Sequence, residues 1–181
     1  MPFRFSFTGP SPDAVEHVRA VPLEPLQDEG DYFYLALTAC GVLEGTDAAF
    51  QIGGFGRDDW AFDIGYDMSA FVEELPRLIE ALSAGFEAEI DLYPQGVERM
   101  LRFSPVGDQV RITCVSRTSW GPRPDTEVCG LDELLAMCVR LAHDFATAVS
   151  AVAPTIAQLA PFDRWRRGEA DGRTVSSSPC V

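Results

Sequence analysis

The chain contains no lysine and no asparagine, so all 14 of its basic residues are arginines. Lysine and asparagine codons are rich in A, and their absence indicates a GC-rich bacterial genome. Basic residues are also few beside the 28 acidic ones, which leaves a formal net charge of −14. Because phosphate backbones require clustered positive charge, this composition argues against a nucleic-acid-binding protein.

The cysteines lack the spacing of a metal motif or of a disulfide framework. No two of them form a CxxC pair, which leaves a zinc knuckle unsupported, and their odd number argues against a disulfide scaffold. Those within apolar stretches are expected to be small buried hydrophobes, and the one beside the C-terminus an inert exposed thiol. The five positions are Cys40, Cys114, Cys129, Cys138 and Cys180.

Long apolar runs are absent as well. Residues 1–7 contain no apolar stretch of signal-peptide length, and no other run approaches a membrane span. We therefore expect a cytoplasmic protein with no membrane partner. A chain of 181 residues that is 46% hydrophobic can fill the core of one domain. We predict a single α+β domain over residues 1–166 and a disordered polar C-terminal tail over 167–181.

The strongest pattern lies at Phe86–Leu92, where apolar and acidic residues alternate without a break. A period of two residues is typical of a strand with one buried face. Further strands are expected at about Val97–Phe103 and Gln109–Ser116, because turn residues separate the three segments. The pattern therefore predicts a three-stranded antiparallel meander with one apolar face.

Amphipathic helices are predicted on both sides of this meander in the sequence. Ser69–Ala84 and Leu131–Val152 each carry an apolar stripe at helical spacing. Pro76 is expected to kink the first of them, and Gly85 to follow its end, where a left-handed backbone is needed. Asp67 or Ser69 is expected to cap its start.

Four more strands are predicted before the first of these helices, at residues 3–8, 31–43, 48–55 and 60–64. The segment 31–43 is almost continuously apolar, as expected for a central strand covered on both faces. Short helices at 13–20 and 154–165 and a loop at 118–130 complete the order. Because strands and helices do not alternate regularly, we predict an α+β fold with a mostly antiparallel sheet and two main amphipathic helices packed on one face.

A metal site has one weak set of candidates, Asp58, Asp59 and Asp63, with Asp67 close by in sequence. Carboxylate oxygens are suitable ligands for a divalent cation. However, a turn, a solvent-facing side chain and a helix cap explain the same residues, and the spacing of an EF-hand is absent. We therefore expect no metal and no cofactor.

No pattern identifies a catalytic residue either. His143 and Asp144 are adjacent on a predicted helix and so do not face each other. A nucleophile elbow is absent, and the glycines of Gly53–Gly56 are not followed by the lysine of a phosphate-binding loop. The basic cluster Arg164–Arg167 is expected to end the last helix, where cations oppose the negative end of the helix dipole.

The candidate interface residues lie on the predicted meander or close to it in sequence. Glu87, Glu89 and Asp91 share the polar face of its first strand and would present negative charge to a basic partner. Tyr93 and Trp120 lie near strand ends and are the residue types enriched in binding hot spots. The same aromatic residues could equally cover the core, so both interpretations stay open.

The segment Asp63–Pro154 resembles the small acidic immunity-type proteins encoded beside bacterial polymorphic toxins. The parts that carry the resemblance are the sequence Trp60-Ala-Phe-Asp-Ile64, the helix Phe71–Leu82, the charged meander Phe86–Arg117 and the closing helix Leu131–Val152. The resemblance implies a non-enzymatic inhibitor that covers a basic toxin surface. Such families are catalogued as domains of unknown function, and the resemblance assigns no functional residue.

Three hypotheses follow. The first is a non-catalytic cytoplasmic binding protein with a basic protein partner. The second is a small-molecule-binding protein or enzyme with a pocket between sheet and helices, lined by Tyr32, Tyr34, Trp60 and Tyr66. The third is a module that forms homodimers or larger homo-oligomers through an exposed sheet face or edge.

Overall fold

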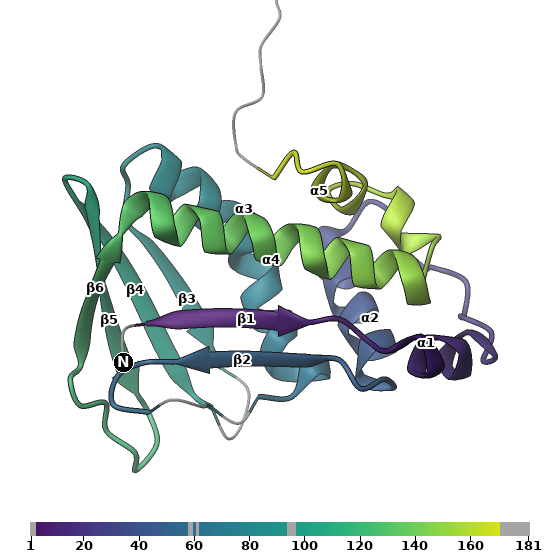
Figure 1. Cartoon of the computed structure of the whole chain (residues 1–181), viewed down its shortest axis with the longest axis horizontal. Coiled ribbons are helices and arrows are strands. Elements are labelled where there is room, and N and C mark those ends of the chain that lie inside the picture. Colours follow the sequence, from purple (N-terminus) through teal and green to yellow (C-terminus); the bar gives the residue numbers. More distant parts are fainter. Residues whose placement is uncertain (1–2, 58–59, 61, 94–96, 171–181) are drawn as a thin grey trace, which may run out of the picture.

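The computed structural model describes residues 3–57, 60, 62–93 and 97–170. Figure 1 shows a four-stranded sheet at one end of the molecule, helices extending from it and a separate two-stranded ribbon alongside. In chain order the elements are β1 (Arg4–Thr8), α1 (Pro12–Arg19), α2 (Tyr32–Glu44), β2 (Ala49–Gly53), the π-helical turn η1 (Ile64–Met68), α3 (Ser69–Ser83), β3 (Ala88–Leu92), β4 (Arg99–Val106), β5 (Gln109–Ser116), β6 (Thr126–Gly130), α4 (Leu131–Val152), the 3₁₀ turn η2 (Ile156–Gln158) and α5 (Phe162–Arg166).

The main sheet has the order β3-β4-β5-β6, and all of its strand pairs are antiparallel. The predicted meander is confirmed as β3, β4 and β5. A two-residue turn joins β4 to β5, and its first residue, Gly107, has φ +66°, which suits glycine in this kind of hairpin. The prediction of a loop over 118–130 is wrong for its last five residues, because residues 126–130 form β6 and pair with β5.

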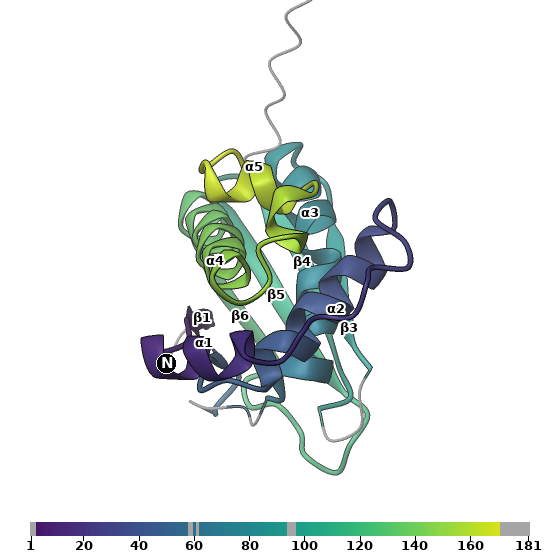
Figure 2. The same cartoon turned by 90° about the vertical axis from the view of Figure 1, so that its right-hand side faces the viewer.

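One face of this sheet is buried against helices, which confirms the α+β fold. Ile90, Leu101, Phe103 and Ile112 point inward from β3, β4 and β5. α3 contacts β3, and α4 contacts β5, β6 and α3. Figure 2 shows α3 and α4 side by side in front of the sheet. Burial of this shared apolar surface provides the main favourable free energy of folding.

The segment predicted as a central strand at 31–43 is a helix, α2. Asp31 caps its start, since the Asp31 side chain accepts a hydrogen bond from the Tyr34 backbone N–H at 3.3 Å. Its buried residues lie on one face of the helix, but the exposed face also carries apolar side chains, Phe33 and Leu37, so the helix has little amphipathic contrast. The buried residues are Leu35, Ala36, Ala39, Cys40 and Leu43. The predicted strand at 48–55 does form as β2, but its partner is β1.

The strand predicted at 60–64 is also wrong. Asp63 has an extended backbone and its side chain accepts a hydrogen bond from the Tyr66 N–H at 2.9 Å, so that it caps η1. Asp67 and Ser69 do not cap α3 as predicted, because η1 runs directly into α3 and no side chain caps the α3 start.

Pro76 lies inside α3 and cannot donate a hydrogen bond to the carbonyl of Val72, four residues earlier. That carbonyl accepts a hydrogen bond from the Tyr32 hydroxyl instead, which links α2 to α3. Burial raises the pKa of Tyr32 well above its ordinary value, and this keeps the donor proton in place. One side chain from α2 therefore satisfies the backbone group left unpaired by the proline.

The C-terminal part of the described chain packs on α4. α5 contacts α4, and Ala170 is buried. Arg167 pairs with Asp163 at 3.2 Å and with Glu169 at 3.1 Å, so residues 167–170 belong to the folded part and not to the predicted tail. Residues 171–181, the remainder of that predicted tail, lie outside the described residues.

α4 is long and apolar enough to cross a membrane by length and composition alone. In the fold it packs in the interior, with Leu134, Cys138, Phe145 and Val149 buried. A core helix of a globular protein passes the same test, and this helix fits that description.

Candidate functional site

A groove runs between α3 and β3, which is a terminal strand of the sheet. It has a volume of about 500 Å³, and apolar atoms of Leu78, Ala81 and Ala88 contribute to its lining. We call it the strand-edge groove. Its charged lining is mostly acidic and comprises Glu74, Arg77, Glu87, Glu89 and Asp91. Three of these residues are the carboxylates predicted at the interface, so the fold adds only Glu74 and Arg77 to the charged set.

Basic residues of the neighbouring strands partly neutralise these carboxylates. Arg102 Nε donates to Glu89 at 2.6 Å, and Arg117 Nη2 donates to both oxygens of Asp91 at 2.7 Å. Glu87 accepts a hydrogen bond from the Ser104 hydroxyl at 2.7 Å. The outer face of the sheet therefore carries exposed ion pairs, and on the α3 side Glu74 pairs with Arg77 at 3.4 Å. Glu87 differs from Glu74, Glu89 and Asp91 in that its partner is a neutral hydroxyl.

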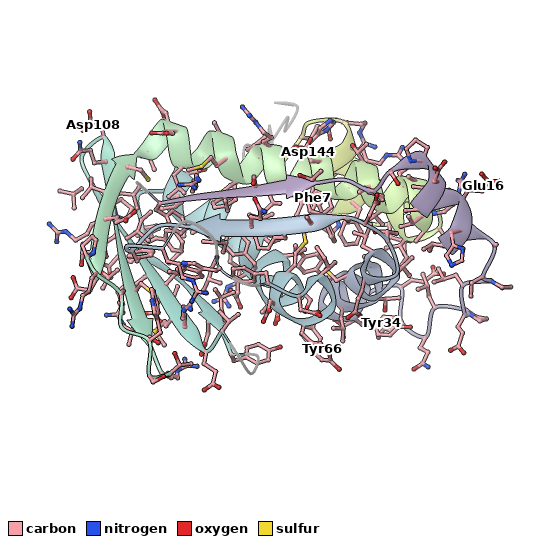
Figure 3. The ribbon with its side chains drawn as sticks, turned by 60° about the horizontal axis from the view of Figure 1, so that its bottom comes forward. Phe7, Glu16, Tyr34, Tyr66, Asp108 and Asp144 are labelled. Carbon is pink, nitrogen blue, oxygen red and sulfur yellow. The ribbon has the colours of Figure 1, made fainter. Side chains whose placement is uncertain are left out.

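A second groove, of about 530 Å³, lies beside the first where α2, η1 and the end of β3 meet. We call it the tyrosine groove, and its lining residues are Phe33, Leu37, Asp63, Tyr66, Asp67, Ser69 and Tyr93. Tyr66 and Tyr93 are 68% and 55% exposed. Figure 3 shows Tyr66 projecting outward on the same side of the molecule as Tyr34 of α2. Large aromatic side chains left this open are typical of binding surfaces.

Asp67 lines the tyrosine groove together with the polar residues Asp63 and Ser69, and it is only 6% exposed. Its Oδ2 accepts a hydrogen bond from the Asp63 N–H at 2.8 Å, whereas its buried Oδ1 has no hydrogen-bond partner. Burial raises the pKa of Asp67, and the nearby charge of Asp63 raises it further. Asp63 also raises the pKa of Glu44, mainly by charge repulsion. The carboxylates around the groove therefore carry negative charge that lacks a full complement of partners.

Tyr93 belongs to the tyrosine groove and lies two residues beyond Asp91 of the strand-edge groove. Burial raises its pKa first, and the negative charges of Glu73 and Asp91 raise it further. Asp91 lines the strand-edge groove, whereas Tyr93 lines the tyrosine groove. Because Asp91 and Tyr93 are two residues apart, the two grooves lie on neighbouring parts of the surface, which together we call the acidic face.

Arg99 lies behind this face and is only 4% exposed. Its guanidinium carbon stands 4.1 Å from the ring centres of both Trp60 and Trp120. Its Nε and Nη1 have no hydrogen-bond partner, and burial lowers its pKa. Trp120, which the sequence offered as an interface anchor or a core lid, is half-buried with Arg99 over its ring.

The aromatic residues predicted to line a pocket do not converge. Tyr32 bonds Val72, Tyr34 accepts a hydrogen bond from the Gln27 N–H at 3.2 Å, and Trp60 is buried beside Arg99. Only Tyr66 reaches the tyrosine groove. Phe33 and Leu37, which also line it, were missed because they lie on a segment predicted as a strand.

The metal and catalytic candidates are likewise dispersed. Asp58 and Asp59 lie outside the described residues, and Asp63 caps η1. Within the described ranges no three His, Cys, Asp or Glu side chains are placed to hold a metal ion. His143 Nδ1 lies 3.2 Å from the Trp165 carbonyl oxygen, which ties α4 to α5, and Asp144 lines a different groove beside β1.

No protein-family model, curated protein or solved structure matches the chain. The function is therefore inferred from the geometry and charge of the molecule.

Proposed function

We propose that the chain is a non-catalytic bacterial binding protein of the immunity type, which works in the cytoplasm and presents the acidic face to a basic protein partner. One observation carries the proposal: Glu74, Glu87, Glu89 and Asp91 line a single groove beside the terminal strand β3. A basic segment that entered this groove would meet complementary charge along its length. Such complementarity speeds association and selects against acidic competitors.

The same charges act against the homodimer hypothesis at this edge. Two copies of β3 placed edge to edge would bring their carboxylates together, and charged edge strands commonly prevent such pairing. A basic strand from another protein would instead be attracted to these carboxylates. The acidic edge therefore supports a heterologous partner over a second copy of this chain.

The tyrosine groove supports a second candidate, a protein that binds a small organic cation. Its aromatic wall and buried carboxylate suit a ligand with one positive group. This candidate corresponds to the pocket hypothesis with a different set of lining residues. It differs from the first in that the ligand would bind without any contact to the strand-edge groove.

A defined peptide tests the proposal. A fluorescent peptide of alternating arginine and valine is titrated with the protein at low salt, beside the same peptide with citrulline in place of arginine. Glu74→Gln combined with Glu87→Gln should weaken binding of the arginine peptide about tenfold or more, because both carboxylates line the groove.

The matched control is Glu16→Gln combined with Glu24→Gln, since both residues are exposed and lie outside the groove. This control changes the net charge by the same amount and should retain most of the affinity. Equal losses in the two double variants would show that net charge alone drives binding and would contradict the proposed site. Equal affinity for the citrulline peptide would contradict the requirement for a basic partner.

A further inference from the structure

We propose that the tyrosine groove holds one arginine side chain of the partner, with its guanidinium against Asp67 and its planar face on the aromatic wall. This inference rests on the proposed function and names the partner group that the groove selects. Its starting point is a buried carboxylate oxygen, Asp67 Oδ1, which has no hydrogen-bond partner and belongs to a side chain that lines a groove open to solvent. Burying an unpaired charge is costly, and a cation in the groove would offset that cost.

The existing neighbours of Asp67 do not pair with its Oδ1. Its Oδ2 is occupied by the Asp63 N–H, and Asp63 adds negative charge. Arg99 acts on Asp67 electrostatically, but no ion pair joins these two described side chains, and Arg99 is held between two tryptophans. The internal cation therefore does not satisfy Asp67 Oδ1.

The wall of the groove favours guanidinium over other cations. The exposed aromatic side chains of the groove are Phe33 of α2, Tyr66 of η1 and Tyr93, the residue after β3. Leu37 of α2 adds apolar surface to the same lining. A guanidinium is planar, stacks on aromatic faces and donates parallel N–H groups to a carboxylate. An ammonium is more strongly hydrated and has no planar face, so the same groove should bind it less tightly.

The position of the groove fits an arginine on a chain that runs along β3. Tyr93 lies two residues beyond Asp91, so the tyrosine groove continues the line of the strand-edge groove. A basic segment beside β3 would thus place one side chain at Asp67 while its other basic residues met Glu74 and Glu87.

Small probes test the chemistry of the groove without a partner. The protein is titrated with n-butylguanidinium, n-butylammonium and neutral n-butylurea, and binding is followed by backbone amide NMR shifts. The guanidinium probe should shift the amides of Tyr66, Asp67 and Tyr93 saturably, the ammonium probe should bind several-fold more weakly, and the urea should not bind. Scattered or unsaturable shifts with the guanidinium probe would overturn the inference.

Two variants locate the effect. Asp67→Asn should reduce the affinity for n-butylguanidinium about tenfold or more, while Asp108→Asn, which removes the same charge at an exposed turn of the sheet (Figure 3), should not. Tyr66→Ala removes an exposed ring and should weaken binding with no change in thermal stability. It therefore tests the groove even if Asp67→Asn alters the fold.

The arginine–valine peptide separates this inference from the proposed function. Loss of peptide affinity in both Asp67→Asn and Tyr66→Ala supports both. Peptide binding that both variants leave unchanged overturns the inference and leaves the proposed function standing. Binding of n-butylguanidinium without any binding of the peptide overturns the proposed function, and with it the partner's arginine as occupant of the groove.

Discussion

At the scale of single residues, two buried charged side chains define the region behind the acidic face. Asp67 and Arg99 influence each other electrostatically but form no ion pair, and each keeps buried polar atoms without partners. Burial raises the pKa of Asp67 and lowers the pKa of Arg99, so both charged forms cost free energy in the folded state. Native proteins leave few such atoms unpaired, which makes this pair informative.

Asp67→Asn should therefore stabilise the free protein at pH 7, by on the order of 1 kcal/mol, because it removes a buried charge with an unpaired oxygen. The pKa of Asp67 is higher in the folded than in the unfolded chain, so the folded chain binds more protons between these two values. The loss of folding free energy caused by the Asp67 charge is therefore complete at pH 7. It disappears as the pH falls through the raised pKa of Asp67 toward its ordinary pKa.

Urea unfolding of the wild type and the Asp67→Asn variant at a series of pH values checks this. The difference in free energy of unfolding should shrink as the pH falls from 7 toward 4. Since Glu44 titrates in both proteins, it cancels in the difference to first order. A variant less stable than the wild type at pH 7, or a gap that grows at acid pH, would contradict the account.

Arg99→Lys should destabilise the protein by about 2 kcal/mol, because lysine keeps the charge but cannot stack its planar group between Trp60 and Trp120. Arg102→Lys is the matched control on the same strand, where an exposed pair with Glu89 is worth less than about 1 kcal/mol. Chemical unfolding followed by tryptophan fluorescence measures both. An equal loss of unfolding free energy in the two variants would contradict a stabilising stack of the Arg99 guanidinium between the two tryptophans.

At the scale of elements, α2 and α3 are joined by the hydrogen bond from the Tyr32 hydroxyl to the Val72 carbonyl. Tyr32→Phe should cost about 1 to 3 kcal/mol, because it leaves that carbonyl unpaired. In a Pro76→Ala background, the alanine N–H can bond Val72 in the ordinary helical way, and the same change should cost less. A double-mutant cycle by thermal or urea unfolding measures this coupling. Additive effects of the two substitutions would contradict the linkage.

The sequence predicts some elements well because their patterns are local. The strict alternation at Phe86–Leu92 and the helical stripe at Leu131–Val152 each specify one structure. α2 is different, because its residues are apolar on most sides and period alone cannot separate a buried helix from a buried strand. Its length and the Asp31 cap were the signals that favour a helix. At 60–64 an alternating pattern was overridden by the cap that starts η1.

The candidate site was predictable only in part for the same reasons. Glu87, Glu89 and Asp91 could be placed on one face from their spacing. Their partners Arg102 and Arg117 could not, since pairing across strands depends on a register that a single strand does not encode. The tyrosine groove forms where α2, η1 and the end of β3 meet in the folded chain. It could not be predicted because α2 and η1 were not recognised as helical.

At the scale of the whole molecule, the net charge of −14 makes association with a basic partner depend on salt. Raising the ionic strength from about 0.05 M to about 0.5 M shortens the screening length to a few ångströms, so long-range attraction should be lost. The affinity for the arginine–valine peptide should fall steeply, mainly through a slower association rate. Stopped-flow mixing at several salt concentrations checks this, and an association rate independent of salt would contradict electrostatic docking.

The most direct test of the account is to locate the bound peptide. Backbone amide shifts are recorded during titration of the protein with the arginine–valine peptide at low salt. The account predicts that saturable shifts concentrate on α3, β3 and η1, around Glu74, Glu87 and Asp67. Shifts centred on α4 and β1, or spread evenly over the surface, would contradict the assignment of the acidic face as the binding site.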